Sequence, residues 1–407
     1  MKSAYTLNKY LIVALASLIL AGCGEKKKKT ETPVKNIAID DSLRSRLAKF
    51  ASKPRTKGQF AFSVYDLTAD KPVYGFNENK AIPVASCLKL LSGVAGLHLL
   101  GTQYMYTTSV YTSGNVENGT LHGDIALRGG LDPQLNGPDL AMFVKALKKK
   151  GISKMDGRLV VDLVIKDPVK SEPHWYPWDL SFSRYGLFYK GAPRIMKELK
   201  TEMRVQGIDV ADSQVVLGSV PRGSHCIFRF GRSIQLVTRR MWKNSSNTQA
   251  TSLLYTIGHR INPNGSPTDV GVDYLRKFLR EDLGQKDTSL VIHDGCGLCT
   301  YNHLSPTVLT AVLRYGYKDK AIYRTLYRQL SISGVDGTLR REMSDVKLRG
   351  KIHGKTGTLS HPFGISSLAG YCKGSNGHVL AFAIMDSEMS VLDARVLQDH
   401  LGMALVK

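Results

Sequence analysis

The stretch AIPVASCLKLLSGVAGLHLLG at residues 81–101 decides how the rest of the chain is interpreted. Ser86 and Lys89 lie three positions apart, so on a helix their side chains share one face with about 5–6 Å between Cβ atoms. The following residues are nearly all apolar, which predicts a helix buried on almost every side and ended at Gly101. Burial favours the neutral lysine amine, which can accept a proton from a serine hydroxyl. Because an isolated Ser-x-x-Lys is common by chance, the alternative is that Ser86 caps the helix while Lys89 reaches solvent.

Two later motifs supply the partners that this pair needs. A Ser-x-Asn motif lies at 245–247, and a Lys-Thr-Gly motif lies at 355–357. Each motif alone is weak, but the three in this order form a strong signature when they lie on a helix, a helix-edge loop and a strand. They resemble the active-site motifs of penicillin-binding proteins and serine β-lactamases.

Three further stretches narrow this resemblance. They are GGLDP at 129–133, DG at 294–295 and GVDGTL at 334–339. With them, nearly all of the chain after residue 40 resembles the low-molecular-mass class C penicillin-binding proteins. These form the D-alanyl-D-alanine carboxypeptidase/endopeptidase family.

The resemblance implies an α+β protein with the transpeptidase fold of penicillin-binding proteins and serine β-lactamases, an antiparallel sheet flanked by helices. The strand-rich composition between two helical regions predicts one small inserted α+β domain at 104–233. The catalytic domain is then discontinuous, at 41–103 and 234–407. We expect a lipoprotein signal peptide at 1–22 and a lipidated, flexible tether at 23–40.

The resemblance also assigns a role to each polar residue of the three motifs. Ser86 is the nucleophile that attacks a D-alanyl peptide bond, and Lys89 is its general base. Ser245 relays a proton to the leaving amine, and Asn247 orients Lys89 and the substrate. Lys355 supplies electrostatic stabilisation and carboxylate binding, and its charge near Lys89 favours the neutral amine of Lys89.

Substrate binding is expected along the strand that carries the third motif. Thr356, Gly357 and Thr358 are predicted to let the substrate lie alongside as an added strand. In the family, the backbone N–H groups of Ser86 and Thr358 form the oxyanion hole, at about 3–4 kcal/mol per donor. Asp179, in an aromatic-rich stretch, falls near the aspartate that recognises the amine of a diaminopimelate side chain.

The N-terminus has the layout of an exported lipoprotein. Lys2 and Lys9 precede an apolar run at 11–20, and Leu-Ala-Gly-Cys at 20–23 resembles the bacterial lipobox. Lipidation of Cys23 would anchor the chain without a transmembrane span. We therefore expect an exported, periplasmic protein held to a bacterial membrane, the outer one, through its lipid. Plain secretion with an incidental Cys23 is the alternative.

Composition describes an ordinary globular protein with an unusual charge. The chain of 407 residues is 43% hydrophobic and 22% charged, with a formal net charge of +22. Such a charge favours anionic surfaces, and export makes peptidoglycan and a membrane the expected partners rather than nucleic acid, for which no motif is evident. The resemblance adds β-lactams as covalent inhibitors. No cofactor and no metal are expected.

Five cysteines besides Cys23 give an odd number, so a disulfide framework is not implied. The family usually has serine or threonine where Cys87, Cys296 and Cys299 stand. A redox or metal site at Cys296-x-x-Cys299 lacks a second group of ligands, and His98 is interpreted as a core histidine. Whether these two cysteines are joined stays open.

The spacing between the first two motifs is short for the family. Ser245 follows Ser86 by 245 − 86 = 159 positions, which is less than in members with two inserted domains. We infer that the second inserted domain is missing. A more open cleft would admit cross-linked peptides and favour endopeptidase action.

Two other functions remain as alternatives. A β-lactamase needs a group that activates water for deacylation, and none is evident. A non-catalytic wall-binding module would suit the basic charge and the lipid anchor, but the intact motifs argue against it.

Individual elements follow from periodicity and turn signals. A first helix has Leu43, Leu47 and Phe50 on one face, with Asp41 or Ser42 as its cap. Other predicted elements are strands at 60–66, 72–76, 159–164, 290–293, 368–372 and 379–385, a hairpin at Asn118-Gly119, helices at 138–150, 243–259, 267–283 and from Ser305-Pro306, and a terminal helix.

Overall fold

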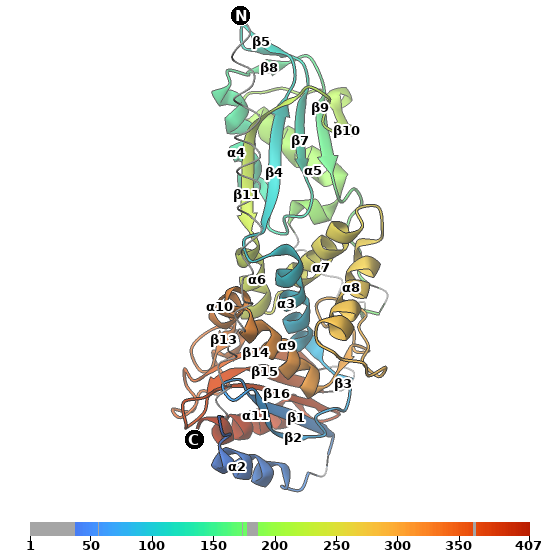
Figure 1. Cartoon of the computed structure of the whole chain (residues 1–407). Coiled ribbons are helices and arrows are strands. Elements are labelled where there is room, and N and C mark those ends of the chain that lie inside the picture. Colours follow the sequence, from blue (N-terminus) through green and yellow to red (C-terminus); the bar gives the residue numbers. More distant parts are fainter. Residues whose placement is uncertain (1–36, 56, 173, 177–185, 361–363) are drawn as a thin grey trace, which may run out of the picture. The chain divides into compact units, whose positions relative to one another are not determined.

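The computed structural model describes residues 37–407, except 56, 173, 177–185 and 361–363 (Figure 1). The predicted signal peptide, Cys23 and Asp179 therefore lie outside the described residues. Residues Ile39–Lys407 form one compact unit, and the architecture below is that of this unit. None of the helices in the described residues is both long enough and apolar enough to cross a bilayer.

A six-stranded antiparallel sheet forms the centre of the catalytic region, in the order β13-β14-β15-β16-β1-β2 (Figure 1). Among the described residues, the first strand therefore pairs with the last one, with Gln59 opposite Ser387. The strands are β13 Ser331–Ile332, β14 Ile352–Leu359, β15 Ile365–Lys373, β16 Val379–Ser387, β1 Gln59–Asp66 and β2 Lys71–Phe76.

Both faces of this sheet are buried, and strand β16 shows why. Its side chains alternate between the faces. Phe382 and Ile384 join a core cluster with helices α2 (Asp41–Ala51) and α11 (Val391–Val406). Ala383 and Met385 join a second, larger cluster on the opposite face. The predicted antiparallel sheet flanked by helices is confirmed.

The larger cluster is built around α3, Leu88–Leu100, as its apolar sequence predicts. Every residue from 88 to 97 is buried, and the helix ends at Gly101 with φ of 82°. The prediction that His98 is a core histidine is wrong, because its side chain is exposed near the end of α3 and contacts the hydroxyl of Tyr315 at 2.7 Å.

The remaining helices of this region surround α3 and the sheet. Helices α6 and α7 meet at the Ser-x-Asn motif, and α9 begins at the predicted Ser305-Pro306, with Ser305 as its cap. The elements are β3 Ile82–Pro83, α6 Ile234–Lys243, α7 Asn247–Ile261, α8 Pro267–Glu281, β12 His303–Leu304, α9 Pro306–Lys318 and α10 Lys320–Gln329.

Residues between α3 and α6 build a second sheet, in the order β10-β9-β7-β4-β11, which has a core of its own. The buried members of that core all lie between residues 110 and 210, although the boundaries 104–233 of an inserted domain stay a prediction. Asn118 and Gly119 both have positive φ and join β5 to β6, as the hairpin signal predicts. The elements are β4 Met105–Thr112, β5 Asn115–Glu117, β6 Thr120–His122, β7 Ile125–Gly129, α4 Gly137–Lys149, β8 Lys154–Met155, β9 Leu159–Leu163, α5 Ala192–Val205, β10 Val215–Leu217 and β11 His225–Ser233.

Three local predictions are wrong. The first helix is capped by Asp40, whose carboxylate accepts from the N–H of Leu43, rather than by Asp41 or Ser42. The helix predicted to hold residues 243–247 and to continue to 259 is interrupted, since α6 ends at Lys243 and α7 begins at Asn247, although this does place Ser245 in a loop at a helix edge, as expected for the second motif. The predicted strand at 290–293 is only an isolated bridge from Val291.

Candidate active site

Ser86 lies in a single 3-10 turn, Ala85–Cys87, which leads directly into α3. Lys89 lies in the first turn of α3, and its Nζ is 2.7 Å from Ser86 Oγ. Neither this turn nor α3 has a side-chain cap, so the alternative role of Ser86 as a helix cap is wrong. Lys89 is fully buried, which also excludes an amine that reaches solvent.

Three groups hold the amine of Lys89 in place. Besides Ser86 Oγ, its Nζ bonds Asn247 Oδ1 at 2.8 Å and the carbonyl oxygen of Cys296 at 2.5 Å. A neutral amine keeps two donors for Asn247 and Cys296 and turns its lone pair to Ser86. The arrangement therefore suits an amine that takes the proton of the Ser86 hydroxyl.

A second buried lysine completes the cluster. Lys355 Nζ bonds Ser245 Oγ at 2.8 Å and also the carbonyl oxygen of Thr356. Burial, and to a smaller extent the nearby amine of Lys89, lower the pKa of Lys355 to about 7. Burial likewise lowers the pKa of Lys89, against the opposing effects of Cys296 and Asp294. Burial thus favours the neutral form of both amines, and Lys355 can change protonation near neutral pH.

Two residues at the site have a left-handed backbone that non-glycine residues rarely adopt. Ala85, directly before the serine of the first motif, has φ of 46°, and Ser245 has φ of 56°. Such conformations cost about 1–3 kcal/mol each and persist where the surroundings enforce them. At Ser245 this backbone conformation interrupts the helical path, so α6 and α7 are separate helices. It also places the Ser245 hydroxyl beside Lys355.

Two glycines allow the backbone around Ser86 to pack closely. A Cβ at Gly297 would lie 1.9 Å from the carbonyl oxygen of Ala85, and Gly297 also has φ of 80°. A Cβ at Gly357 would lie 2.9 Å from the backbone nitrogen of Ser86. Glycine at these positions lets the 294–299 loop and strand β14 touch the turn that carries Ser86.

Asp294 organises the loop whose carbonyl holds Lys89. Its fully buried carboxylate accepts from the backbone N–H groups of Cys296, Gly297 and Cys299, at 2.9, 2.6 and 2.9 Å. Trp175, from the predicted insertion, donates its indole N–H to the same carboxylate at 2.7 Å. The aromatic stretch near 175 thus contributes a support for the loop, which sequence reasoning did not foresee.

The thiols near the site are free. Cys87, Cys296 and Cys299 are buried and form no disulfide. Burial raises the pKa of all three thiols, that of Cys299 to about 11. No group of three or more metal-ligating side chains occurs in the residues that the structure describes, and buried thiols with raised pKa values are poor nucleophiles.

The edge of strand β14 is open where the third motif lies. Its partner β13 pairs only with His353 and Gly354. In the described part of the chain, no strand continues that pairing along Lys355–Leu359. Thr356 Oγ1 donates to Thr338 at 2.8 Å, and Thr358 is exposed. An extended peptide can therefore add to this edge.

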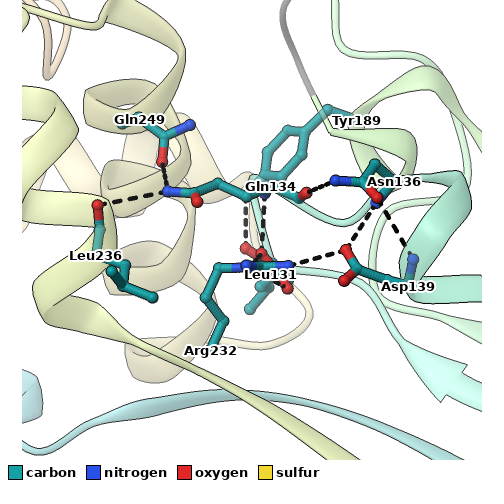
Figure 2. Close-up of polar contacts among 9 residues, drawn as sticks. Leu131, Gln134, Asn136, Asp139, Tyr189, Arg232, Leu236 and Gln249 are labelled. Carbon is teal, nitrogen blue, oxygen red and sulfur yellow. Dashed lines mark hydrogen bonds and ion pairs between the residues drawn. The ribbon is translucent and has the colours of Figure 1, made fainter. Parts of the chain in front are cut away.

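A buried polar cluster joins the predicted insertion to the helices of the site (Figure 2). Arg232 Nε bonds both carboxylate oxygens of Asp132, at 2.8 and 2.9 Å, and its Nη2 bonds Asp139 at 2.9 Å. Gln134 follows in the same loop and bonds Gln249 Oε1 at 2.9 Å. Gln249 lies in the first turn of α7, two residues after Asn247, so this loop contacts the helix that carries the second motif.

The predicted site residues thus divide into two groups. Those of the three motifs come together: Ser86, Lys89 and Asn247 share one hydrogen-bonded group, and Ser245 and Lys355 form another. Asp179 and Cys23 lie outside the described residues. Asp294 and Thr338 belong to two of the stretches that carry the family resemblance, but no motif predicts the supporting roles of Trp175 and Gly297.

These features define the class of serine acyl-transfer enzymes with the penicillin-binding fold. The family described as D-Ala-D-Ala carboxypeptidase 3 (S13) matches residues 43–185 and 188–405. The chain therefore belongs to this family of serine-type D-Ala-D-Ala carboxypeptidases.

Individual relatives agree with the family. The D-alanyl-D-alanine carboxypeptidase DacB of Haemophilus influenzae is 22% identical over 405 residues, which cover 79% of this chain and 84% of that protein. The crystal structure of penicillin binding protein 4 from the same organism has a TM-score of 0.74 at 18% identity and covers 88% of this chain and 98% of that chain. Bd3459, a predatory peptidoglycan endopeptidase from Bdellovibrio bacteriovorus, has a TM-score of 0.57 at 15% identity and covers 84% of this chain and 89% of that chain.

Proposed function

We propose that Ser86 is the nucleophile of this peptidase and that Lys89 is its general base. The observation that carries the proposal is the 2.7 Å contact between Lys89 Nζ and Ser86 Oγ, in a site where Lys89 is fully buried. Ser86 Oγ attacks the carbonyl carbon of a D-alanyl peptide bond while its proton passes to the neutral amine of Lys89. Asn247 and the carbonyl of Cys296 hold that amine in position.

The second half of the site serves the leaving group. As the tetrahedral intermediate collapses, the C–N bond breaks and the leaving amine takes the proton that Lys89 accepted, relayed through Ser245, which bonds Lys355 at 2.8 Å. Lys89 is then neutral again. Water attacks the acyl-enzyme ester and gives a proton to Lys89, and this proton passes to Ser86 Oγ as the ester C–O bond breaks. The pKa of Lys355, lowered to about 7, suits a group that exchanges protons near neutral pH.

Substrate lies along strand β14 in this proposal. The open edge at Lys355–Leu359 takes an extended peptide, and the hydroxyls of Thr356 and Thr358 contact a C-terminal carboxylate. The backbone N–H groups of Ser86 and Thr358 stabilise the oxyanion. Gly357 permits this arrangement because a side chain there would collide with Ser86. Asp179 remains the proposed contact for a diaminopimelate amine.

The substrate is peptidoglycan, and the proposed preference is for cross-linked stems as well as free pentapeptides. The support is the spacing of 159 positions between Ser86 and Ser245, which leaves room for one insertion. Bd3459, a protein with a related fold, is described as a peptidoglycan endopeptidase. Digestion of purified cross-linked muropeptides tests this: release of monomers supports it, and release of free D-alanine alone contradicts it.

Covalent binding of penicillin follows from the same acylation step. Intact-protein mass spectra are expected to gain one penicillin mass, and Ser86→Ala is expected to gain none. A long-lived fluorescent penicillin label separates this enzyme from a β-lactamase, which would lose the label quickly and hydrolyse nitrocefin. Unchanged wall hydrolysis by Ser86→Ala would instead favour a non-catalytic role for the site.

The proposed location is the periplasm, with a lipid on Cys23 that holds the chain to the outer membrane. The support is the Leu-Ala-Gly-Cys sequence after an apolar run, followed by a lysine-rich tether. Metabolic labelling with a fatty-acid analogue is expected to mark the wild type and to leave Cys23→Ala unmarked. Equal labelling of both would contradict the anchor, and fractionation of the labelled protein identifies the membrane.

A further inference from the structure

A cavity of about 390 Å³ lies beside the active-site helices and takes no part in the steps above. One wall is the 133–137 loop at the start of α4. The other walls come from the residues before and within α5 and from α6, which contributes Arg240. The cavity thus combines residues of the predicted insertion with a helix that leads to the second motif.

The cavity is cationic. Lys190, Arg194 and Arg240 line it together with one carboxylate, Glu198. Arg194 pairs with Glu198 at 2.6 Å, so these two charges balance each other. Within the described residues, neither Lys190 nor Arg240 has an ion-pair partner. Two uncompensated positive charges therefore face a cavity of the size of a small ligand.

The cavity is physically connected to the catalytic helices. Gln134 lines it and bonds Gln249 in the first turn of α7 (Figure 2). The carbonyl oxygen of Arg240 accepts the backbone N–H of Ser246, next to Ser245 in the turn between α6 and α7. The ion pair between Arg232 and Asp132, directly before the 133–137 loop, holds that loop in place. A ligand in this cavity would therefore contact residues that are hydrogen-bonded to the turn and the helix that carry the second motif.

We propose that this cavity is a subsite for carboxylate groups that a peptidoglycan peptide carries away from its scissile bond. The proposal rests on the proposed function, because that function makes an acidic wall peptide the substrate. Wall peptides contain carboxylates besides the C-terminal one, and Lys190 and Arg240 offer the opposite charge. The cavity would thus favour natural acidic stems over neutral ones of the same length.

The test compares two substrates on one double variant. Lys190→Gln/Arg240→Gln removes both charges and keeps side chains of similar polarity. The substrates are one wall peptide ending in D-Ala-D-Ala with free carboxylates and the same peptide with its internal carboxylates amidated. The wild type is expected to have a KM for the acidic peptide that is roughly 3- to 10-fold lower, from two exposed charge contacts. The double variant is expected to lose this preference through KM.

A matched control separates a local effect from net charge. Lys149→Gln/Arg229→Gln removes the same two charges at exposed positions outside the cavity lining. This control is expected to keep the preference for the acidic peptide. A preference that survives in the cavity variant, or that falls equally in the control, overturns the proposal.

Labelling with fluorescent penicillin keeps this test apart from the test of the proposed function. A labelled cavity variant with an unchanged preference refutes the subsite alone. An unlabelled wild type refutes the proposed function itself. If the double variant fails to fold, the single variants Lys190→Gln and Arg240→Gln are each expected to lose part of the preference, and an unchanged preference in both overturns the subsite.

Discussion

At the scale of single residues, the site depends on buried amines that form no hydrogen bond to a carboxylate in the described part of the chain. Lys89 and Lys355 are both fully buried, and their Nζ atoms bond carbonyl, amide and hydroxyl oxygens. Burial disfavours the charged form, so each lysine destabilises the fold while it serves the chemistry. Stability and activity therefore oppose each other at these two positions.

Lys355→Met is expected to make the protein more stable and less active at pH 7. The folded pKa of Lys355 is about 7, below its ordinary value of 10.5. The folding penalty is therefore fully present below about pH 7 and disappears as the pH rises towards 10.5. We expect a gain in unfolding free energy on the order of 1–4 kcal/mol at pH 7, which shrinks by pH 10. Denaturant titrations at both pH values measure it, and a gain that is constant with pH would contradict it.

Asp294→Ala is expected to lower both activity and stability. The loss of one carboxylate leaves the backbone N–H groups of Cys296, Gly297 and Cys299 without their acceptor. We expect about 3 kcal/mol of destabilisation and a reduction of the penicillin acylation rate by about 10-fold or more, because the carbonyl of Cys296 moves away from Lys89. Stopped-flow acylation and thermal melts provide the two measurements.

Cys296→Ser is the control for this loop. The contact with Lys89 uses the backbone carbonyl of residue 296 and not its side chain. Acylation is therefore expected to stay within about 3-fold of the wild type, since the buried thiol is neutral and takes no part in the chemistry. A loss as large as that of Asp294→Ala would show that the thiol itself matters.

At the scale of elements, the site forms where three backbone segments touch. The turn at Ala85–Cys87 packs against the 294–299 loop on one side and against strand β14 on the other. Both segments can pack this closely because Gly297 and Gly357 have no side chains. The position of Ser86 therefore depends on glycine at these two positions.

Gly297→Ala is expected to reduce acylation by about 100-fold or more, because its Cβ would meet the carbonyl oxygen of Ala85 at 1.9 Å. Gly377→Ala is a matched control, since Gly377 has the same φ of 80° and no heavy atom within 4 Å of the added Cβ. Both variants carry the backbone strain of a positive φ, about 1 kcal/mol. Equal acylation rates in the two variants would refute the importance of the close contact.

Sequence reasoning succeeded where a repeating pattern carried the information. The apolar run after Lys89 predicted a buried helix, and Ser305-Pro306 predicted a helix start. It failed where one residue decided the outcome. The left-handed backbone of Ser245 interrupts a helix at a position where no glycine or proline predicts an interruption. Exposure of His98 likewise depends on where α3 ends relative to its neighbours, which an apolar pattern does not specify.

The supporting residues of the site were harder to predict than the reacting ones. Ser86, Lys89 and Lys355 belong to short motifs that can be recognised in the sequence from their residue types and spacing. Trp175 supports the 294–299 loop from 119 positions away, and no local pattern links the two. Long-range contacts of this kind depend on the tertiary fold.

At the scale of the whole molecule, the main sheet also buries a carboxyl group on a central strand. Asp386 on β16 is completely buried. Burial raises the pKa of its carboxyl well above the usual range, although Arg55 and Gln398 oppose this effect. The group is therefore protonated in the folded protein at a pH where the unfolded chain is ionised.

Asp386→Asn is expected to stabilise the protein at neutral pH. Since the folded pKa is raised, the unfavourable contribution of Asp386 is absent below about pH 4 and grows as the pH rises above the unfolded value. The variant should therefore gain unfolding free energy, on the order of 1–3 kcal/mol at pH 7, and little at pH 4. A gain of equal size at both pH values would show that the carboxyl is not the cause.

The pairing of β1 with β16 has a consequence for how the chain is made. Ser63 lies opposite Ala383, and 383 − 63 = 320 positions separate them. During synthesis β1 can pair with β2, which follows it directly, but its other edge stays unpaired until β16 has left the ribosome. Such distant closure slows folding. The main sheet therefore cannot be completed until β16 has been synthesised, so the first part of the catalytic region stays short of its final fold for most of translation.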